Sequence, residues 1–227
     1  MHEGHRERLK SRFLSEGLDN FNPHNVLELL LFYSIPRKDT NEIAHRLIER
    51  FGSLAGVFDA SVEDLLQVEG ITLHSACLIK MIIPMSRYYS ADKFRRKVVL
   101  NSSKLCGDYL LARYLGYTDE MVSLISMDNQ CRIISFDIIG EGDISSAGIS
   151  TRKVIETVIR TKATSAVIAH NHPGGIALPS KEDIEATRNI IEALRVVGVY
   201  LLDHIILAGD DYVSLADSKE FQYLFNY

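Results

Sequence analysis

Apolar positions over residues 5–87 recur at the spacing of short amphipathic helices separated by turn signals. Asn22-Pro23 precedes an apolar stretch over residues 25–33. Ile35-Pro36 ends that stretch, because the residue before a proline is pushed out of the α region. The pattern remains helical throughout this part of the chain, and it predicts an all-helical domain over residues 1–92.

Beyond a polar stretch near residue 95 the pattern changes to one that mixes strands with helices. Two runs rich in β-branched residues, 121–127 and 131–137, predict a β-hairpin. The segments that follow are a helix, a strand, a helix and a strand, over residues 151–162, 165–172, 181–197 and 199–207. Strands that alternate with helices after an antiparallel pair indicate helices packed on a mixed sheet. We therefore predict a second, α/β domain over residues 98–227.

Composition and charge narrow the class of protein. Hydrophobic residues make up 46% of the chain and charged residues 24%, which is typical of globular proteins and excludes a disordered chain. Residues 101–227 carry 11 Lys and Arg against 17 Asp and Glu, a net charge of −6, so this part lacks the basic surface of a non-specific nucleic-acid binder. No secretory signal is visible in the sequence, and no apolar run approaches the roughly 20 residues of a membrane span. The sequence predicts a cytoplasmic protein with no membrane partner.

Candidate metal ligands gather in the segment 170–183. His170 and His172 alternate along a predicted strand, so both imidazoles face one point at its end. A loop rich in proline and glycine then leads to a helix whose first turn carries Asp183. Two neutral nitrogens and one carboxylate suit zinc, and three protein ligands leave a coordination position open, as in catalytic sites. The local alternatives are two hydrogen-bonded histidines and a plain Ser180-x-x-Asp183 capping box.

The motif resembles a known one. His-x-His, seven residues, then Ser-x-x-Asp is similar to the JAMM motif of the MPN metallopeptidase superfamily. The wider sequence resembles the bacterial RadC family, through the segments 170–183, 202–206, 4–10, 35–40 and 51–54. The resemblance implies an MPN domain with a mixed sheet, of the JAB and cytidine-deaminase-like type, preceded by an all-α helical domain.

The resemblance also implies an activity and its residues. His170, His172 and Asp183 would be the ligands of one zinc ion per chain. Ser180 would donate a hydrogen bond to the scissile carbonyl or the oxyanion. The implied enzyme is a zinc metallopeptidase, in which zinc-bound hydroxide attacks an amide or isopeptide carbonyl of a peptide substrate.

Four further positions have open interpretations. The superfamily has a glutamate general base on an earlier strand, and the matching stretch, 135–142, offers Asp137 at the aligned position. Glu141 is the alternative, provided that the glycines around it aim it inward. Asp203 and His204 also fit the family pattern, either as groups that orient a ligand histidine or as an ordinary buried pair on a strand.

The N-terminal domain resembles the helix-hairpin-helix region of the same family, with residues 66–76 as the hairpin. In DNA-binding hairpins, glycines expose backbone N–H groups to phosphate. Gly70 is present here, but Thr72 occupies the second glycine position, and basic support is limited to Lys80 and Arg87. This favours a structural or protein-binding bundle over a DNA-binding one, and no DNA-contacting residue is assigned.

The sequence is compatible with two classes of function. The first is the zinc hydrolase, and the second is a non-catalytic DNA-repair-associated or scaffold protein with a vestigial metal site. A zinc deaminase is excluded, because its His-x-Glu and Pro-Cys-x-x-Cys signatures are absent. A homo-oligomer is compatible with the sequence.

Overall fold

The structure, a computed structural model, describes residues 3–94, 99–141 and 149–226. The chain divides into two compact units, Met1–Ser86 and Arg87–Tyr227. The first expected domain ends at residue 92 and the second begins at residue 98. Most of the segment between these two residues lies outside the described residues. No helix in the described part of the chain combines the length and the apolar character of a membrane span.

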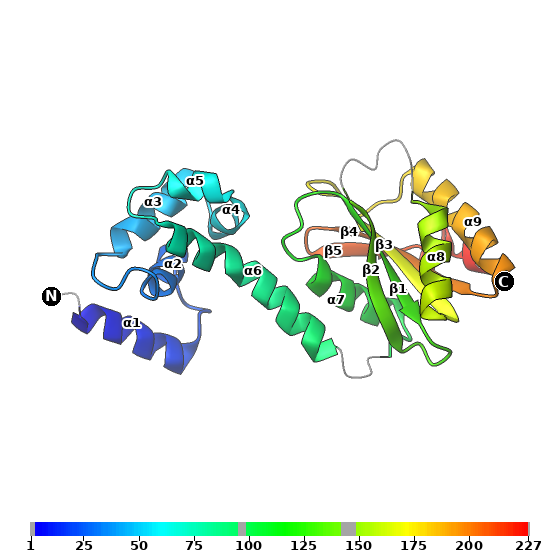
Figure 1. Cartoon of the computed structure of the whole chain (residues 1–227), viewed down its shortest axis with the longest axis horizontal. Helices are drawn as coiled ribbons and strands as arrows, with labels where there is room; N and C mark the ends of the chain where they lie inside the picture. The colour runs from blue at the N-terminus through cyan, green and yellow to red at the C-terminus, as the bar shows by residue number, and fades with distance from the viewer. Residues whose placement is uncertain (1–2, 95–98, 142–148, 227) are drawn as a thin grey trace. The chain divides into compact units, whose positions relative to one another are not determined.

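The first unit is helical, as the sequence predicts (Figure 1). Its helices are α1 (Glu3–Glu16), α2 (Pro23–Leu31), α3 (Asn41–Phe51), α4 (Leu54–Asp59), α5 (Val62–Leu66) and α6 (Leu73–Phe94), the last of which extends past residue 86. Its core consists of apolar side chains from α2 to α6, among them Leu27, Leu31, Leu47, Leu65 and Ile79. Burial of these side chains drives the packing of helices that are individually too short to be stable in water.

Backbone conformation and close packing both require a glycine, Gly70, in the predicted hairpin between α5 and α6. Gly70 has φ +95°, a conformation that side chains with a Cβ rarely adopt. A Cβ at this position would also lie 2.7 Å from Cδ1 of Ile43. The fold of the helical unit therefore requires Gly70 whether or not the hairpin contacts a phosphate.

Glu28 is a buried carboxylate that joins three helices of this unit. It lies on α2 and is 1% exposed. Its Oε1 is 2.8 Å from Nε2 of His5 on α1, and its Oε2 accepts hydrogen bonds from the side-chain amides of Asn25 and Asn41. A buried carboxyl group with this many partners is costly to remove, because each partner would be left unsatisfied.

We expect Glu28→Ala to lower the free energy of unfolding by about 3 kcal/mol, because it leaves two amides and an imidazole without their acceptor. Urea unfolding followed by circular dichroism measures this loss. The matched control is Glu7→Ala, which removes an exposed carboxylate from α1 and should cost less than about 0.5 kcal/mol. Equal losses in the two variants would contradict the role of Glu28.

The second unit has a five-stranded mixed sheet between two layers of helices, which confirms the predicted α/β fold (Figure 1). The strands are β1 (Met121–Met127), β2 (Ile133–Glu141), β3 (Ser165–Asn171), β4 (Tyr200–Ala208) and β5 (Asp211–Ser214), and their order is β2-β1-β3-β4-β5. Within the described residues, β3 and β4 pair in parallel and the other neighbouring strands pair antiparallel. The helices are α7 (Ser103–Tyr114), α8 (Thr151–Thr161) and α9 (Lys181–Val196), with a short 3-10 helix η1 (Gln222–Phe225).

Alternation along the strands divides the core of this unit into two clusters. Leu124 and Ile168 lie in one cluster with residues of α8 and α9, whereas Ile125 and Val167 lie in the other with residues of α7. Neighbouring residues of a strand point to opposite faces of the sheet. His170, two residues after Ile168, therefore faces the side of α8 and α9.

The hairpin of β1 and β2 forms as predicted, but β2 begins and ends later than the expected range 131–137. The carboxylate of Asp128 accepts hydrogen bonds from the backbone N–H groups of Gln130 and Arg132. These bonds hold the connecting turn together, and Cys131 within it has φ 56°. The turn thus extends to Arg132, which moves the start of the strand to Ile133.

Candidate metal centre

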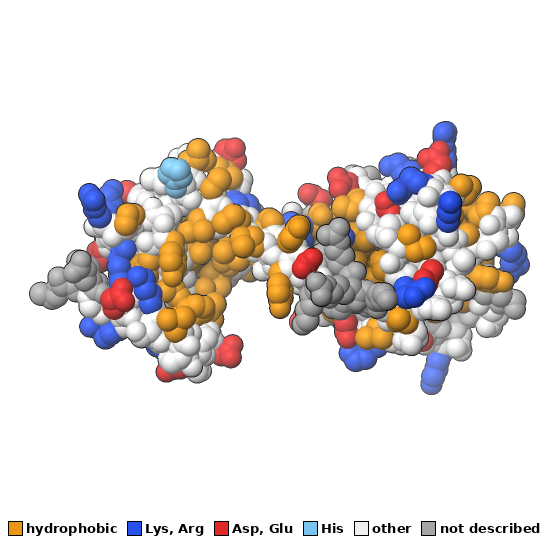
Figure 2. All heavy atoms as spheres, turned by 60° about the horizontal axis from the view of Figure 1, so that its bottom comes forward, with side chains coloured by type: hydrophobic (Ala, Val, Ile, Leu, Met, Phe, Trp, Pro, Cys, Tyr) orange, Lys and Arg blue, Asp and Glu red, His pale blue; other side chains and the backbone are white. Residues whose placement is uncertain are grey.

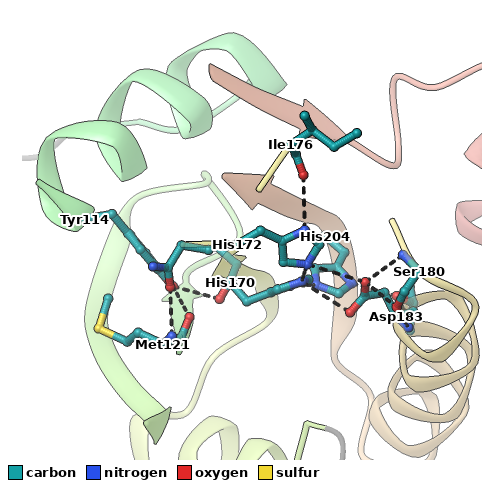
Figure 3. A network of polar contacts seen from close by, with 11 residues as sticks. Tyr114, Met121, His170, His172, Ile176, Ser180, Asp183 and His204 are labelled. Atoms are coloured by element: carbon teal, nitrogen blue, oxygen red, sulfur yellow. Dashed lines mark hydrogen bonds and ion pairs between the residues drawn. The ribbon is translucent and has the colours of Figure 1, made fainter. Parts of the chain in front are cut away.

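Two histidines meet at the end of the central strand β3. His170 is 2% exposed, and His172 follows directly after the strand with its side chain 26% exposed. Their Nε2 atoms lie 2.9 Å apart (Figure 3). The sequence predicts this juxtaposition from alternation along one strand.

Asp183 reaches the histidines from the first turn of α9. Its Oδ1 is 3.2 Å from Nε2 of His170, and its Oδ2 is 3.8 Å from Nε2 of His172 (Figure 3). Burial alone would raise the pKa of this carboxyl. The contact with His170 and the hydrogen bonds from Ser180 outweigh burial and hold the pKa well below its usual range. Asp183 is therefore an anion at neutral pH.

Ser180 fixes Asp183 through a reciprocal capping box. The backbone N–H of Asp183 donates to Oγ of Ser180, while the N–H and the hydroxyl of Ser180 both donate to Oδ2 of Asp183. The same two residues, Ser180 and Asp183, therefore cap the helix and place a carboxylate against the histidines. In this arrangement the hydroxyl of Ser180 donates its proton to Asp183. The donation of a hydrogen bond from Ser180 to an oxyanion remains a prediction.

The donor atoms of this cluster suit a divalent metal ion. Nδ1 of His172 lies 3.2 Å from the carbonyl oxygen of Ile176, which can only accept, so the proton of a neutral His172 is on Nδ1 and Nε2 has the lone pair. The two Nε2 atoms lie 2.9 Å apart, and each faces one oxygen of Asp183, at 3.2 Å for His170 and 3.8 Å for His172. The ligands of a tetrahedral zinc ion lie about 3.3 Å apart.

Glu120 completes a group of three metal-binding side chains with the histidines. One oxygen of Glu120 and one nitrogen from each of His170 and His172 lie within 4.8 Å of one another. In the antiparallel pairing of β1 with β3, Val122 is opposite His170. The same register, continued by two residues, brings Glu120 opposite His172 on the same face. Two carboxylates, Asp183 and Glu120, therefore flank the histidine pair.

Asn171 holds the segment that carries Glu120. Its side-chain Oδ1 accepts a hydrogen bond from the backbone N–H of Met121 at 2.7 Å. Its Nδ2 donates to the carbonyl oxygen of Asp119 at 3.0 Å. The amide thus binds the peptide groups on both sides of Glu120 and restricts where its carboxylate can lie.

The structure does not bring the two expected general bases, Asp137 and Glu141, to the histidines. The carboxylate of Asp137 accepts hydrogen bonds from Arg160 and from Ser135, both at 2.6 Å. Glu141 is exposed at the end of β2, the outer strand, and β1 separates β2 from β3. Gly142, part of the turn expected to aim Glu141 inward, lies outside the described residues. Glu120 was not identified from the sequence, because its place beside the histidines follows from the register of β1 on β3 rather than from a local pattern.

His204 and Asp203, neighbours on β4, have different surroundings. Nε2 of His204 lies 2.9 Å from Nδ1 of His170, and Nδ1 of His204 lies 2.7 Å from the hydroxyl of Thr187 on α9. Burial, followed by the nearby His170, lowers the pKa of His204 to about 3, so its imidazole is neutral. Asp203 instead accepts hydrogen bonds from the hydroxyl of Ser214 and the N–H of Ala216. Of this pair, only His204 contacts a candidate ligand.

Asp203 makes the stability of the α/β unit depend on pH. Burial raises the pKa of its carboxyl to about 6, despite the hydrogen bonds that it accepts. The folded state holds this proton more tightly than the unfolded state does. Protonation of Asp203 therefore contributes fully to the free energy of unfolding below about pH 4, and this contribution is lost as the pH rises through about 6. A shift of about 2 pKa units corresponds to about 3 kcal/mol.

We expect Asp203→Asn to remove this dependence, because the amide is neutral at every pH. Urea unfolding at pH 4 and at pH 7 measures the effect. The stability of the variant relative to the natural chain should rise by about 3 kcal/mol between these two pH values. A difference that is the same at both would contradict a raised pKa.

Comparison with known proteins yields similar sequences along nearly the whole chain. Residues 100–220 match the family described as RadC-like JAB domain. The chain is 33% identical over 222 residues to a UPF0758 protein of Fusobacterium nucleatum subsp. nucleatum, covering 95% of this chain and 96% of that protein. It is 30% identical to a UPF0758 protein of Nitrosococcus oceani and 28% identical to one of Pseudoalteromonas translucida, covering in each case 93% of this chain and 94% of the relative.

Proposed function

Because this chain belongs to the family of proteins with a RadC-like JAB domain, we propose that it is a zinc-dependent metallohydrolase acting on an amide or isopeptide bond. The observation that carries the proposal is the convergence of His170, His172 and Asp183, with Glu120 beside them, at one end of the sheet. Two nitrogens and a carboxylate with an adjacent second carboxylate are the groups that a hydrolytic metal site requires.

Each residue has a role in this proposal. His170, His172 and Asp183 would hold one zinc ion. The chemistry that a bound zinc ion supplies is Lewis-acid polarisation of the carbonyl and activation of water. Glu120 is the general base, since its carboxylate lies close enough to the histidines to accept a proton from the attacking water and to donate it to the leaving amine. The Asn171 amide keeps Glu120 in place for both steps.

The surroundings of the site favour an extended peptide substrate. The loop between β3 and α9 directly follows His172 and exposes Ile176 and Leu178, which are 68% and 56% exposed. Exposed apolar side chains beside the histidines suit the side chains of a polypeptide better than they suit a small polar metabolite. The groove that Ser180 lines with Lys181 and Ile184 follows the outer side of α9 and includes none of His170, His172, Asp183 and Glu120.

A cleavage assay tests the proposal. The full chain, loaded with zinc, is incubated with a diverse mixture of peptides and of lysine-linked isopeptides, and the products are identified by mass spectrometry. We expect specific cleavage that disappears after treatment with a chelator and returns when zinc is restored. Cleavage that persists in the chelated protein, or no cleavage of any member by the zinc-loaded chain, would contradict the proposed hydrolase.

For the helical unit we propose a structural or protein-binding role. The ammonium of Lys80, which could have contacted phosphate, donates to the carbonyl oxygens of Phe58 and Ala60 and so caps the end of α4. Figure 2 shows hydrophobic side chains gathered on this unit, and its exposed large apolar residues include Tyr33 and Leu73. An exposed apolar surface is typical of protein contacts, whereas DNA contacts require basic groups.

We therefore expect the full chain not to retard double-stranded DNA in a gel at about 0.15 M salt, because Asp and Glu outnumber Lys and Arg by 12 to 9 over residues 1–86 and by 17 to 11 over residues 101–227. A titration of salt at fixed DNA concentration gives the number of phosphate contacts from the slope of the binding constant. Tight binding with a steep salt dependence would contradict this role and favour the DNA-associated alternative.

A further inference from the structure

A chain of hydrogen bonds runs from α9 through β4 to β3 and ends at the metal centre. The hydroxyl of Thr187 lies 2.6 Å from the backbone carbonyl oxygen of Asp183 and 2.7 Å from Nδ1 of His204. Nε2 of His204 lies 2.9 Å from Nδ1 of His170 (Figure 3). Thr187 and His204 are both 0% exposed, so water does not compete for these bonds.

The donors and acceptors in this series of hydrogen bonds determine which atom donates in each bond. A carbonyl oxygen can only accept, so the single hydroxyl proton of Thr187 is donated to Asp183. The hydroxyl oxygen must then accept from Nδ1–H of His204. With its proton on Nδ1, a neutral His204 has its lone pair on Nε2 and accepts from Nδ1–H of His170.

A neutral His170 is thereby left with its lone pair on Nε2, and a second proton on that atom, which the Asp183 carboxylate favours, would have to leave before a metal ion binds. This is the nitrogen that lies 2.9 Å from Nε2 of His172 and 3.2 Å from Oδ1 of Asp183. A metal ligand needs a lone pair at that atom, and the hydrogen bond at the other ring nitrogen decides which nitrogen is free.

We infer that Thr187 and His204 are positioning residues that select the Nδ1–H tautomer of His170 and so prepare its Nε2 to bind the metal. The inference rests on the proposed function only for the presence of the metal, because the tautomer is a property of the chain alone. Among the described residues, Thr187 is also the point where α9, the helix that carries Asp183, is joined to His204.

Loss of the hydroxyl releases this constraint. Without an acceptor at residue 187, His204 can place its proton on Nε2 and donate it to Nδ1 of His170. A neutral His170 would then carry its proton on Nε2, where it obstructs the metal. Binding would require a change of tautomer against the remaining hydrogen bonds, which weakens affinity.

Two matched variants test the inference. Thr187→Val keeps the branched shape and removes the hydroxyl, whereas Thr187→Ser keeps the hydroxyl and removes a methyl group. Zinc affinity of the full-length protein is measured by competition with a chromogenic chelator. We expect the affinity to be about 10- to 100-fold weaker in the valine variant, the range for loss of a group that supports a ligand, and to be largely retained in the serine variant.

A second measurement separates tautomer selection from a merely structural role. Nitrogen-15 NMR of the histidine rings in the metal-free protein, recorded at a pH at which His170 is neutral, reports which nitrogen of His170 carries the proton. We expect Nδ1–H in the natural chain and in the serine variant, and a shift toward Nε2–H in the valine variant.

The two measurements distinguish failure of the inference from failure of the proposed function. An unchanged tautomer and an unchanged zinc affinity in the valine variant would overturn the inference, and so would an Nε2–H tautomer in the metal-free natural chain. Absence of zinc binding in the natural chain would instead overturn the proposed function, while the NMR result would still decide the tautomer.

Discussion

Glu120→Gln is expected to lower the rate of amide hydrolysis by about 100- to 10,000-fold while zinc binding is retained. The range is the usual contribution of a general base. Glutamine keeps the size and shape of the side chain and leaves the backbone hydrogen bonds of Asn171 on either side of it unchanged, but it cannot accept a proton at neutral pH. The measurement is kcat/KM on a peptide cleaved by the natural chain, together with zinc content per chain.

Asp137→Asn is the matched control for Glu120→Gln. The carboxylate of Asp137 is bound to Arg160 and Ser135 rather than to the histidines, so its replacement should leave the rate nearly unchanged. A large loss in the Asp137 variant, with normal activity in the Glu120 variant, would contradict the assignment of the base. It would favour Asp137, one of the two candidate bases, Asp137 and Glu141, that the sequence leaves open.

Asp183→Asn is expected to weaken zinc binding by more than about 100-fold, because loss of a partner that only supports a ligand already costs about 10- to 100-fold. Asparagine retains an oxygen that can accept from the backbone N–H of Ser180, so the start of α9 should remain capped. The variant therefore separates the charge of Asp183 from its role in the helix. Chelator competition gives the affinity, and thermal unfolding monitors the helix.

Glu182→Gln provides the same change of charge in the same turn of α9. Glu182 is exposed in that first turn, beside Asp183. If the general negative charge of the turn mattered, both variants would weaken zinc binding alike, and a ligand role for Asp183 would be contradicted. We expect the Glu182 variant to bind zinc as the natural chain does.

The parts of the site that could be predicted from sequence are those fixed by local geometry. Alternation along a strand determines that His170 and His172 share a face. The Ser180-x-x-Asp183 capping box places Asp183 at the start of its helix, and the structure contains that box. Both patterns span only a few residues, so no knowledge of the distant chain is needed to recognise them. The length of the loop between them allows the start of the helix to return to the end of the strand, and the RadC resemblance, which the comparisons confirm, implies that the three side chains bind one metal ion.

The parts that could not be predicted depend on strand register across long stretches of chain. Glu120 faces His172 only because β1 pairs with β3, a strand more than 40 residues further along the chain. The local signal is the hairpin of β1 with β2, and it directs attention to carboxylates on β2 such as Asp137. His204 reaches His170 through the parallel pairing of β3 with β4. Neither pairing has a signature in the residues that it joins.

The measurement that tests the central claim most directly is the zinc content of the purified, untagged full chain, determined by elemental analysis beside His172→Ala. Nε2 of His172 faces both His170 and Asp183, so its loss should empty the site. We predict about one zinc ion per natural chain and none in the variant. A natural chain that holds no zinc after zinc has been supplied, or a variant that holds as much as the natural chain, would contradict the metal centre described here.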